Sequence, residues 1–274
     1  MRILFIGDVV GALGMETVKS ALPDAIRRWK IDATVVNGEN SADAGFGITK
    51  ACFQGLRDAG ADVVTLGNHS WSHKEALAFI SSETRLIRPM NYVPNAPGSG
   101  SVLFETARGE RVMVLNALGR LFMEPSDDPF GAVDRILGDR VLGRDADAIV
   151  LDFHCEATGE KQAMGLFCDG RVSLVVGTHT HTPSADHRIL PGGTAYITDA
   201  GMTGDYHSVV GMDKDEPVRR FVTGYGTGRF HPADGTASLC GVAIETDPST
   251  GLAVGIAPVR LGGVIEQRVP DFWH

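Results

Sequence analysis

The sequence predicts an α/β protein with two packed sheets rather than a barrel, and three observations support this fold class. Early in the chain, short apolar runs rich in β-branched residues alternate with longer segments whose apolar residues recur at helical spacing. The end of the chain is rich in apolar runs of strand length, which favours layered sheets. Glycine accounts for 34 of 274 residues, as expected for a chain with many loops at strand ends.

The expected elements of the first part follow from these patterns. Each apolar run that predicts a strand is followed by glycine or polar residues, which predict a loop. In chain order we expect a strand at 2–7, a helix at about 15–30, a strand at 33–37, a helix at 48–59, a strand at 62–66 and a helix at 73–82.

After this region, a passage rich in proline and glycine, 89–100, is expected to be a long surface loop. Alternating apolar residues on either side of Arg108-Gly109 then predict a hairpin. The expected strands from here onward are 102–106, 111–117, 146–153, 173–177, 194–198, 238–246 and 252–261.

Composition limits the class of protein. We expect a single domain, residues 1–274, because the chain has no internal repeat and no low-complexity linker. A formal net charge of −9 without basic blocks argues against a surface that binds duplex DNA. The four scattered cysteines indicate reduced thiols rather than a disulfide framework. No segment resembles a signal peptide or a membrane span, so a soluble cytoplasmic protein without a membrane partner is expected.

Five of the predicted strands run into a side chain that can bind a cation. Because parallel strands present their carboxyl ends along one edge, residues distant in sequence can converge there. Mixed oxygen and nitrogen ligands suit manganese, iron or zinc, and the lack of clustered cysteines argues against an iron–sulfur centre or a structural zinc finger. The candidates are Asp8, Glu39, Asn40, Asn68, His69, His154, His179 and His181.

Each candidate also has a simpler interpretation. Asp8 could cap a helix or form a turn, and Asn40 could form an Asx turn. His154 could be a hydrogen-bonded histidine at a strand end. His179 and His181 are expected on one face of an extended segment, because residues i and i+2 point the same way, but a surface position is the alternative. The joint pattern at five strand ends favours a metal site.

The same residues occur in motifs that resemble a known family. Gly7-Asp8, Asn37-Gly38-Glu39-Asn40, Gly67-Asn68-His69 and Gly177-Thr178-His179-Thr180-His181 resemble successive blocks of the calcineurin-like metallophosphoesterases. The segments 40–49, 152–161, 199–204 and 208–212 are similar to the YmdB-type branch, whose members are assigned as 2′,3′-cyclic-nucleotide phosphodiesterases. The resemblance covers nearly the whole chain.

The resemblance implies a four-layer α/β/β/α sandwich of two mixed sheets flanked by helices, with a dinuclear metal centre. Two departures matter. Asp8-Val9-Val10 lacks the histidine of the superfamily's Asp-x-His motif, so Asn40 is expected to replace it, and Glu39 stands where many relatives have aspartate. Iron is the expected metal, with manganese or zinc as alternatives. One ion would be held by Asp8, Glu39, Asn40 and His181, and the other by Glu39, Asn68, His154 and His179.

The implied activity is hydrolysis of 2′,3′-cyclic nucleotides. A hydroxide that bridges the two ions would attack phosphorus, and His69 would protonate the leaving oxygen. As an alternative, His69 caps the following helix or hydrogen-bonds a metal ligand. Two other functions stay open: a phosphomonoesterase acting on nucleotides or other small phosphates, and a nucleotide-binding regulatory protein with little turnover. The expected partner is a small phosphoester, with RNA ends and a second copy of the chain as further candidates.

Overall fold

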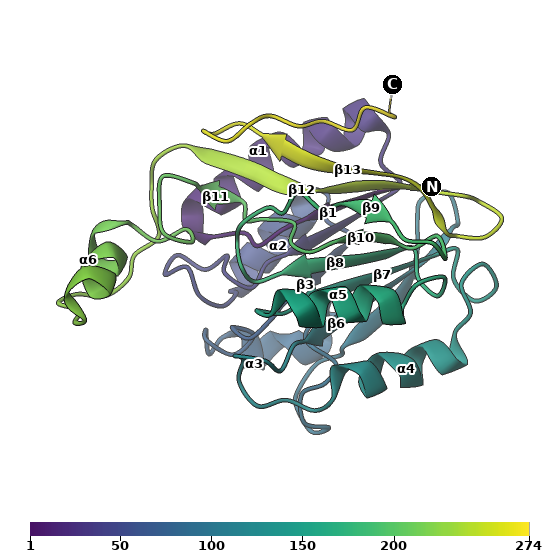
Figure 1. Ribbon diagram of the computed structural model, residues 1–274, viewed down its shortest axis with the longest axis horizontal. Helices are drawn as coiled ribbons and strands as arrows, with labels where there is room; N and C mark the ends of the chain where they lie inside the picture. Colours follow the sequence, from purple (N-terminus) through teal and green to yellow (C-terminus); the bar gives the residue numbers. More distant parts are fainter. Residues whose placement is uncertain (274) are drawn as a thin grey trace.

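Two mixed β-sheets stack face to face in the computed structural model, which describes residues 1–273 (Figure 1). The first sheet has the order β11-β12-β1-β2-β3-β4, with β13 beside β12, and the second has the order β5-β6-β7-β8-β10-β9. The first contains β1 (Arg2–Ile6), β2 (Ala33–Asn37), β3 (Val63–Thr65), β4 (Leu86–Ile87), β11 (Gly204–Asp205), β12 (Ala237–Thr246) and β13 (Ala253–Leu261). The second contains β5 (Ser101–Glu105), β6 (Arg111–Leu118), β7 (Ala148–His154), β8 (Leu174–Thr178), β9 (Arg188–Ile189) and β10 (Ala195–Ile197).

Helices cover the outer face of each sheet. The helices are α1 (Gly11–Trp29), α2 (Lys50–Asp58), α3 (Ala76–Phe79), the 3₁₀ helix η1 (Ile80–Ser82), α4 (Pro129–Asp139), α5 (Thr158–Phe167) and α6 (Asp215–Thr223). Helices α1 and α2 pack on the first sheet, and α4 and α5 on the second. Helix α6 lies apart from these layers (Figure 1).

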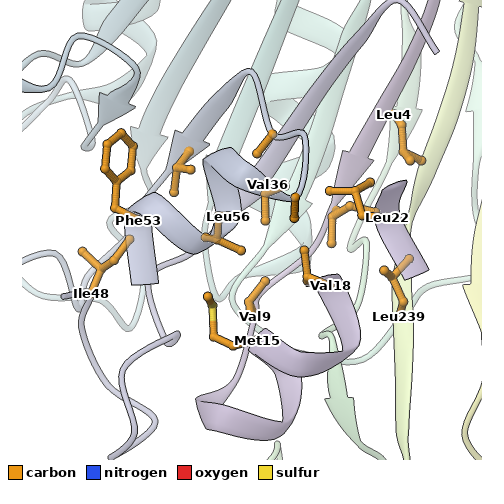
Figure 2. Packing of buried hydrophobic residues seen from close by; sticks show 14 of the residues in the cluster. Leu4, Val9, Met15, Val18, Leu22, Val36, Ile48, Phe53, Leu56 and Leu239 are labelled. Atoms are coloured by element: carbon orange, nitrogen blue, oxygen red, sulfur yellow. The ribbon is translucent and has the colours of Figure 1, made fainter. Parts of the chain in front are cut away.

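Three apolar cores separate the four layers. In β1, Leu4 and Ile6 face the helices, whereas Ile3 and Phe5 face the second sheet, because successive strand residues point to opposite faces. Figure 2 shows the helical side of the first sheet, where Leu22 of α1 and Leu4 of β1 belong to the same core. The second sheet has its own core against α4 and α5. The four-layer α/β/β/α arrangement implied by the resemblance is confirmed.

The strand predictions agree with the structure more closely than the helix predictions do. Every predicted strand is present within two residues of its expected bounds. The predicted helix at 15–30 begins earlier, at Gly11. The predicted helix at 73–82 is shorter and less regular than expected, because only the single turn of α3 and the following η1 form there. The single domain over residues 1–274 stays a prediction, although both sheets contribute to the core between them.

The passage 89–100 lacks helix and strand, as expected, but it is not wholly a surface loop. Asn91 is buried, and its side-chain amide donates hydrogen bonds to the carbonyl oxygens of Leu118 at 2.8 Å and Asp127 at 2.9 Å. These bonds fasten the passage to the end of β6. Within residues 1–273, no helix combines the length and the apolar character needed to cross a membrane.

Candidate metal centre

The predicted site residues gather at one rim of the sandwich. The sequence predicts convergence along one edge of a sheet, but the strand ends come from both sheets: β1, β2 and β3 are parallel in the first, and β7 and β8 are parallel in the second. The site therefore lies across the junction of the two sheets. Asp8 follows β1, Glu39 and Asn40 follow β2, Asn68 and His69 follow β3, His154 ends β7, and His179 and His181 follow β8.

One half of the site is formed around His154. Its Nε2 atom lies 3.0 Å from Glu39 Oε1 and 2.9 Å from Asn68 Oδ1. His179 Nδ1 lies 3.1 Å from the same nitrogen. Glu39, His154 and His179 each offer a ligand atom within 4.8 Å of the others. Imidazole nitrogens, a carboxylate and an amide oxygen at such spacing form a donor set that suits a first-row transition metal.

The other half also contacts the Glu39 carboxylate. Asn40 Nδ2 is 3.1 Å from His181 Nε2 and 3.3 Å from Glu39 Oε1. His181 Nε2 is in turn 3.9 Å from Asp8 Oδ1. Glu39 thus contacts members of both halves, which is the position that a bridging carboxylate requires.

Two unpaired oxygens indicate that the second half fits a cation. Asp8 Oδ1 and Asn40 Oδ1 are buried and have no hydrogen-bond partner within residues 1–273. A buried polar atom without a partner costs about 1–3 kcal/mol. A cation bound by these oxygens would satisfy both, so the residues present fit a bound metal.

His154 is oriented by a buried relay of hydrogen bonds. Its Nδ1 atom lies 2.9 Å from Thr178 Oγ1, and that hydroxyl donates to Asp152 Oδ1 at 2.7 Å. Since the hydroxyl proton goes to Asp152, the Thr178 oxygen accepts the Nδ1 proton of His154. Nε2 is therefore the nitrogen that His154 presents to the centre, and outer partners of this kind fix the orientation of metal-binding histidines.

The other two imidazoles also have outer partners. His179 Nε2 lies 3.1 Å from Glu156 Oε2, and His181 Nδ1 donates to the Val210 carbonyl at 2.8 Å. The inward nitrogens are therefore Nδ1 of His179 and Nε2 of His181. Burial, together with the charge of His154, lowers the pKa of His179 to about 3, so its ring is uncharged at neutral pH.

The loop that carries His179 and His181 is not the extended segment that the sequence predicts. His179 has φ of 96° and His181 has φ of 63°, so both adopt left-handed backbone, which costs of order 1–3 kcal/mol per residue. A buried ion pair between Lys161 Nζ and Asp199 Oδ2, 2.7 Å apart, supports the loop. The same carboxylate oxygen accepts from the Thr180 amide at 3.1 Å and the Thr180 hydroxyl at 2.7 Å.

Charge pairing within the centre shifts two pKa values in opposite directions. Burial acts to raise the pKa of Glu39, but the charge and hydrogen bond of His154 outweigh it and lower the pKa to about 2. Burial likewise acts to lower the pKa of His154, and Glu39 outweighs it and raises the pKa to about 9. Without a cation, the centre is thus held together by a buried Glu39–His154 ion pair, whose proton a metal would displace.

His69 is half-buried at the edge of the centre. Its backbone amide donates to Glu39 Oε2 at 3.0 Å, and its ring nitrogen Nδ1 lies 3.0 Å from Ser72 Oγ. The ring also packs against Phe46, with 4.9 Å between ring centroids. Burial lowers the pKa of His69, against the opposing charge of Glu39. The ring does not cap the next helix, since α3 begins only at Ala76.

A cavity of about 460 Å³ opens above the centre. Its polar floor includes Glu39, Asn40, His69, His179 and His181. Glu156 and Thr180 also line the cavity. The apolar part of the lining, here called the apolar wall, comes from Phe46, Val209, Val210, Met212, Pro217, Phe221 and Phe230.

Several residues around the centre are not predicted from the sequence. Asp152 precedes His154 by two positions on β7, and this same-face spacing is a signal that could have found it. Tyr92 Oη donates to the Gly67 carbonyl at 2.9 Å and so supports the loop that carries His69. No comparable sequence signal marks Glu156 or Phe221, because both lie outside the predicted strand ends.

Comparisons with known proteins agree over almost the full length. A family model described as "YmdB-like protein" matches residues 4–259. The chain is 46% identical over 261 residues to the 2′,3′-cyclic-nucleotide 2′-phosphodiesterase of Bacillus subtilis, covering 95% of this chain and 97% of that protein. A hypothetical protein from Thermus thermophilus has a similar structure, with a TM-score of 0.88 at 42% identity over 96% of this chain and 100% of that one. A structure described as a novel phosphatase from Mycoplasma pneumoniae gives a TM-score of 0.88 at 34% identity, over 96% and 93% of the two chains.

Proposed function

The chain belongs to the YmdB-like family and is a phosphoric ester hydrolase, and on this premise we propose that it hydrolyses nucleoside 2′,3′-cyclic monophosphates at a centre of two metal ions. The convergence of seven predicted donors in two halves joined by Glu39 is the observation that carries the proposal. The substrate named for the Bacillus subtilis relative supports the substrate class.

Each half of the centre holds one ion in this proposal. The set contains no thiolate, and its imidazole, carboxylate and amide donors suit iron, manganese or zinc, of which we propose iron. The inward nitrogens of the three histidines and the unpaired oxygens of Asp8 and Asn40 support the assignment. The first ion takes Asp8, Glu39, Asn40 and His181, and the second takes Glu39, Asn68, His154 and His179.

When bound, two cations would lower the pKa of a water molecule and offset the charge on the phosphoryl oxygens. The protein must supply the proton for the leaving group, and we assign this role to His69, which lies beside Glu39 at the cavity edge. An anionic phosphoester next to the ring favours the protonated imidazole despite its burial. Hydrolysis adds water across one P–O bond of the cyclic phosphate. The hydroxyl joins phosphorus, the released ribose oxygen takes the proton from His69, and the proton left by the water restores the His69 imidazolium through solvent.

Variants of single residues separate the roles of ligand and acid. His69→Ala should retain both metals and lose about 10²–10⁴-fold in turnover, the usual contribution of a positioned acid. His73→Ala is the matched control, since His73 lies in the same loop but does not line the cavity. Asn68→Ala and His179→Ala should instead lower the metal content measured by elemental analysis. Full metal occupancy in both variants would contradict the ligand assignment.

The substrate is tested on purified, metal-loaded protein. A nucleoside 2′,3′-cyclic phosphate should be hydrolysed faster than its 3′,5′-cyclic isomer and faster than the monoester. Preference for the monoester would identify a phosphomonoesterase. Tight nucleotide binding without turnover of any of the three would favour a regulatory protein.

We also propose a reducing cytoplasmic location. All four cysteines, Cys52, Cys155, Cys168 and Cys240, are free thiols in the structure, and three of them are buried. Disulfides form and persist mainly in oxidising compartments, so free thiols fit the cytoplasm better.

A further inference from the structure

We propose that the apolar wall of the cavity holds the nucleobase by stacking, and that Phe221 on α6 is the main stacking residue. The inference rests on the proposed function, because it assigns a place to the second part of the same substrate. It predicts a mononucleotide substrate whose base is accepted with little discrimination.

The cavity has two chemically different sides that match the two parts of a cyclic nucleotide. Its floor carries the carboxylate and imidazole groups of the metal centre, and the apolar wall carries Phe46, Met212, Phe221 and Phe230. The volume of about 460 Å³ lies in the range of about 300–1,000 Å³ typical of small-molecule sites. A phosphate on the floor would therefore leave the base facing aromatic and aliphatic side chains.

Helix α6 presents one of its faces to this cavity. Pro217 and Phe221 are four residues apart, so they lie on the same side of the helix, and both line the cavity. Phe221 is 86% exposed although it lines the cavity, so its ring has free surface for a ligand. Val222 is 78% exposed but does not line the cavity.

The wall is held in place by contacts within the α6 region. Glu216 accepts from Arg220 Nε at 2.9 Å and from the Thr227 amide at 2.9 Å, which ties the helix to the loop that follows it. The Arg220 guanidinium lies over the Phe230 ring, 4.2 Å from its centroid. Phe230 in turn packs on the small core that includes Met212. A preformed wall of this kind lowers the entropy lost when a ligand binds.

Phe46 connects the apolar wall to His69, the proposed proton donor. Its ring packs against His69 at 4.9 Å between centroids and also against the core that includes Met212. A ribose placed with one oxygen next to His69 would thus have its base directed along Phe46 toward α6.

The charges around the cavity favour a mononucleotide over an RNA end. Among the described residues that line the cavity, none is lysine or arginine. An additional RNA phosphate inside the cavity would find no lysine or arginine among the lining residues, in a chain whose formal net charge is −9. The wall side chains carry no strong hydrogen-bond donor or acceptor, so they cannot distinguish base edges. Stacking is tolerant of sequence because every base has an aromatic face.

The test compares Phe221→Ala with Val222→Ala as a matched control on the same exposed helix. Two substrates are used with metal-loaded protein: adenosine 2′,3′-cyclic phosphate and glycerol 1,2-cyclic phosphate, which has no base. Phe221→Ala should raise KM for the adenosine substrate about ten-fold, as for loss of one base stack, with kcat unchanged. Its kcat/KM for the glycerol substrate should stay at the parent value. Val222→Ala should leave both substrates unaffected.

An equal change on both substrates, or no change on either, would overturn the stacking role and leave the phosphodiesterase proposal standing. Calorimetric binding of adenosine 3′-monophosphate gives a readout that is independent of turnover. If the parent protein hydrolyses neither substrate, the proposed function fails. In that case, weaker binding of adenosine 3′-monophosphate by Phe221→Ala still supports the stacking role of the apolar wall, whereas unchanged binding refutes it. A dinucleotide ending in a 2′,3′-cyclic phosphate should have a KM no lower than the mononucleotide, and a much lower KM would refute the mononucleotide preference.

Discussion

Thr178→Val removes a hydroxyl group from the centre while nearly preserving the shape of the side chain. In the structure, the Thr178 hydroxyl accepts from His154 Nδ1 at 2.9 Å and donates to Asp152 Oδ1 at 2.7 Å, and all three residues are buried. Valine can do neither. The variant therefore leaves one nitrogen of His154 and one oxygen of Asp152 without these partners.

The expected loss follows from the number of groups affected. A buried polar group that loses its partner costs about 1–3 kcal/mol, so two such groups predict a fall of about 3 kcal/mol in the free energy of unfolding. For a chain of this size, that corresponds to a fall in Tm of roughly 6–12 °C. Loss of an outer partner of a metal-binding histidine typically lowers metal affinity about 10–100-fold.

The assay combines thermal unfolding of the metal-free protein with a metal titration against a competing chelator. Both are done above pH 7, because burial raises the pKa of Asp152 to about 7 and its carboxylate should be ionised. Thr178→Ser keeps the hydroxyl and serves as the control, with near-parent affinity expected. A Thr178→Val protein that unfolds at the parent temperature and binds metal with parent affinity would refute the relay.

Two further predictions concern the centre. The folded-state pKa of His154 is raised from 6.5 to about 9, so protonated His154 stabilises the metal-free fold, and this effect is complete below pH 6.5. The contribution is at most about 3 kcal/mol. It is lost as the pH rises through about 9. Thermal scans should show a Tm that falls over this window in metal-free protein only; a flat profile would contradict the ion pair. Gly67→Ala should cost about 1–3 kcal/mol and lower the metal content, because a Cβ there overlaps the Glu39 carboxylate and the His154 ring. Gly138→Ala, whose Cβ meets no atom within 4 Å, is the control, and parent-like metal content in Gly67→Ala would refute the close approach.

The strands could be predicted from the sequence because most are buried on both faces and read as continuous apolar runs. Helix α5 is not predicted from the sequence, because two of its inward-facing residues are charged. Glu160 accepts from the Arg120 amide, and Lys161 pairs with Asp199. These two charged residues interrupt the apolar pattern that would predict a helix. Their partners are distant in sequence, so nothing in the local sequence shows that they are buried.

Helix α4 is also absent from the predictions, although its start is encoded locally. Asp128 accepts hydrogen bonds from the amides of Phe130 and Gly131, and Pro129 occupies the first turn, which is a helix-start signal. The two-residue strands β4, β9 and β11 depend on pairing with neighbours and carry no local signal of their own.

The site shows the same division between local and tertiary information. Asp8, Glu39 and His154 could be singled out because each stands where an apolar run ends. The left-handed backbone of His179 and His181 depends instead on contacts with Asp199 and Val210. The cavity wall could not be predicted, because Phe221 belongs to a helix whose apolar side chains face solvent.

The position of β12 has a consequence for how the protein is made. This strand comes from near the end of the chain, yet it lies beside β1 in the first sheet, where Ile3 pairs with Ile244. While the ribosome is still producing the middle of the chain, β1 presents an unpaired, strongly apolar edge, the kind of edge that promotes aggregation. The sheet that carries Asp8, Glu39 and Asn68 is completed only when residues 237–246 have been synthesised. We therefore expect nascent chains that stop before β12 to need chaperone protection.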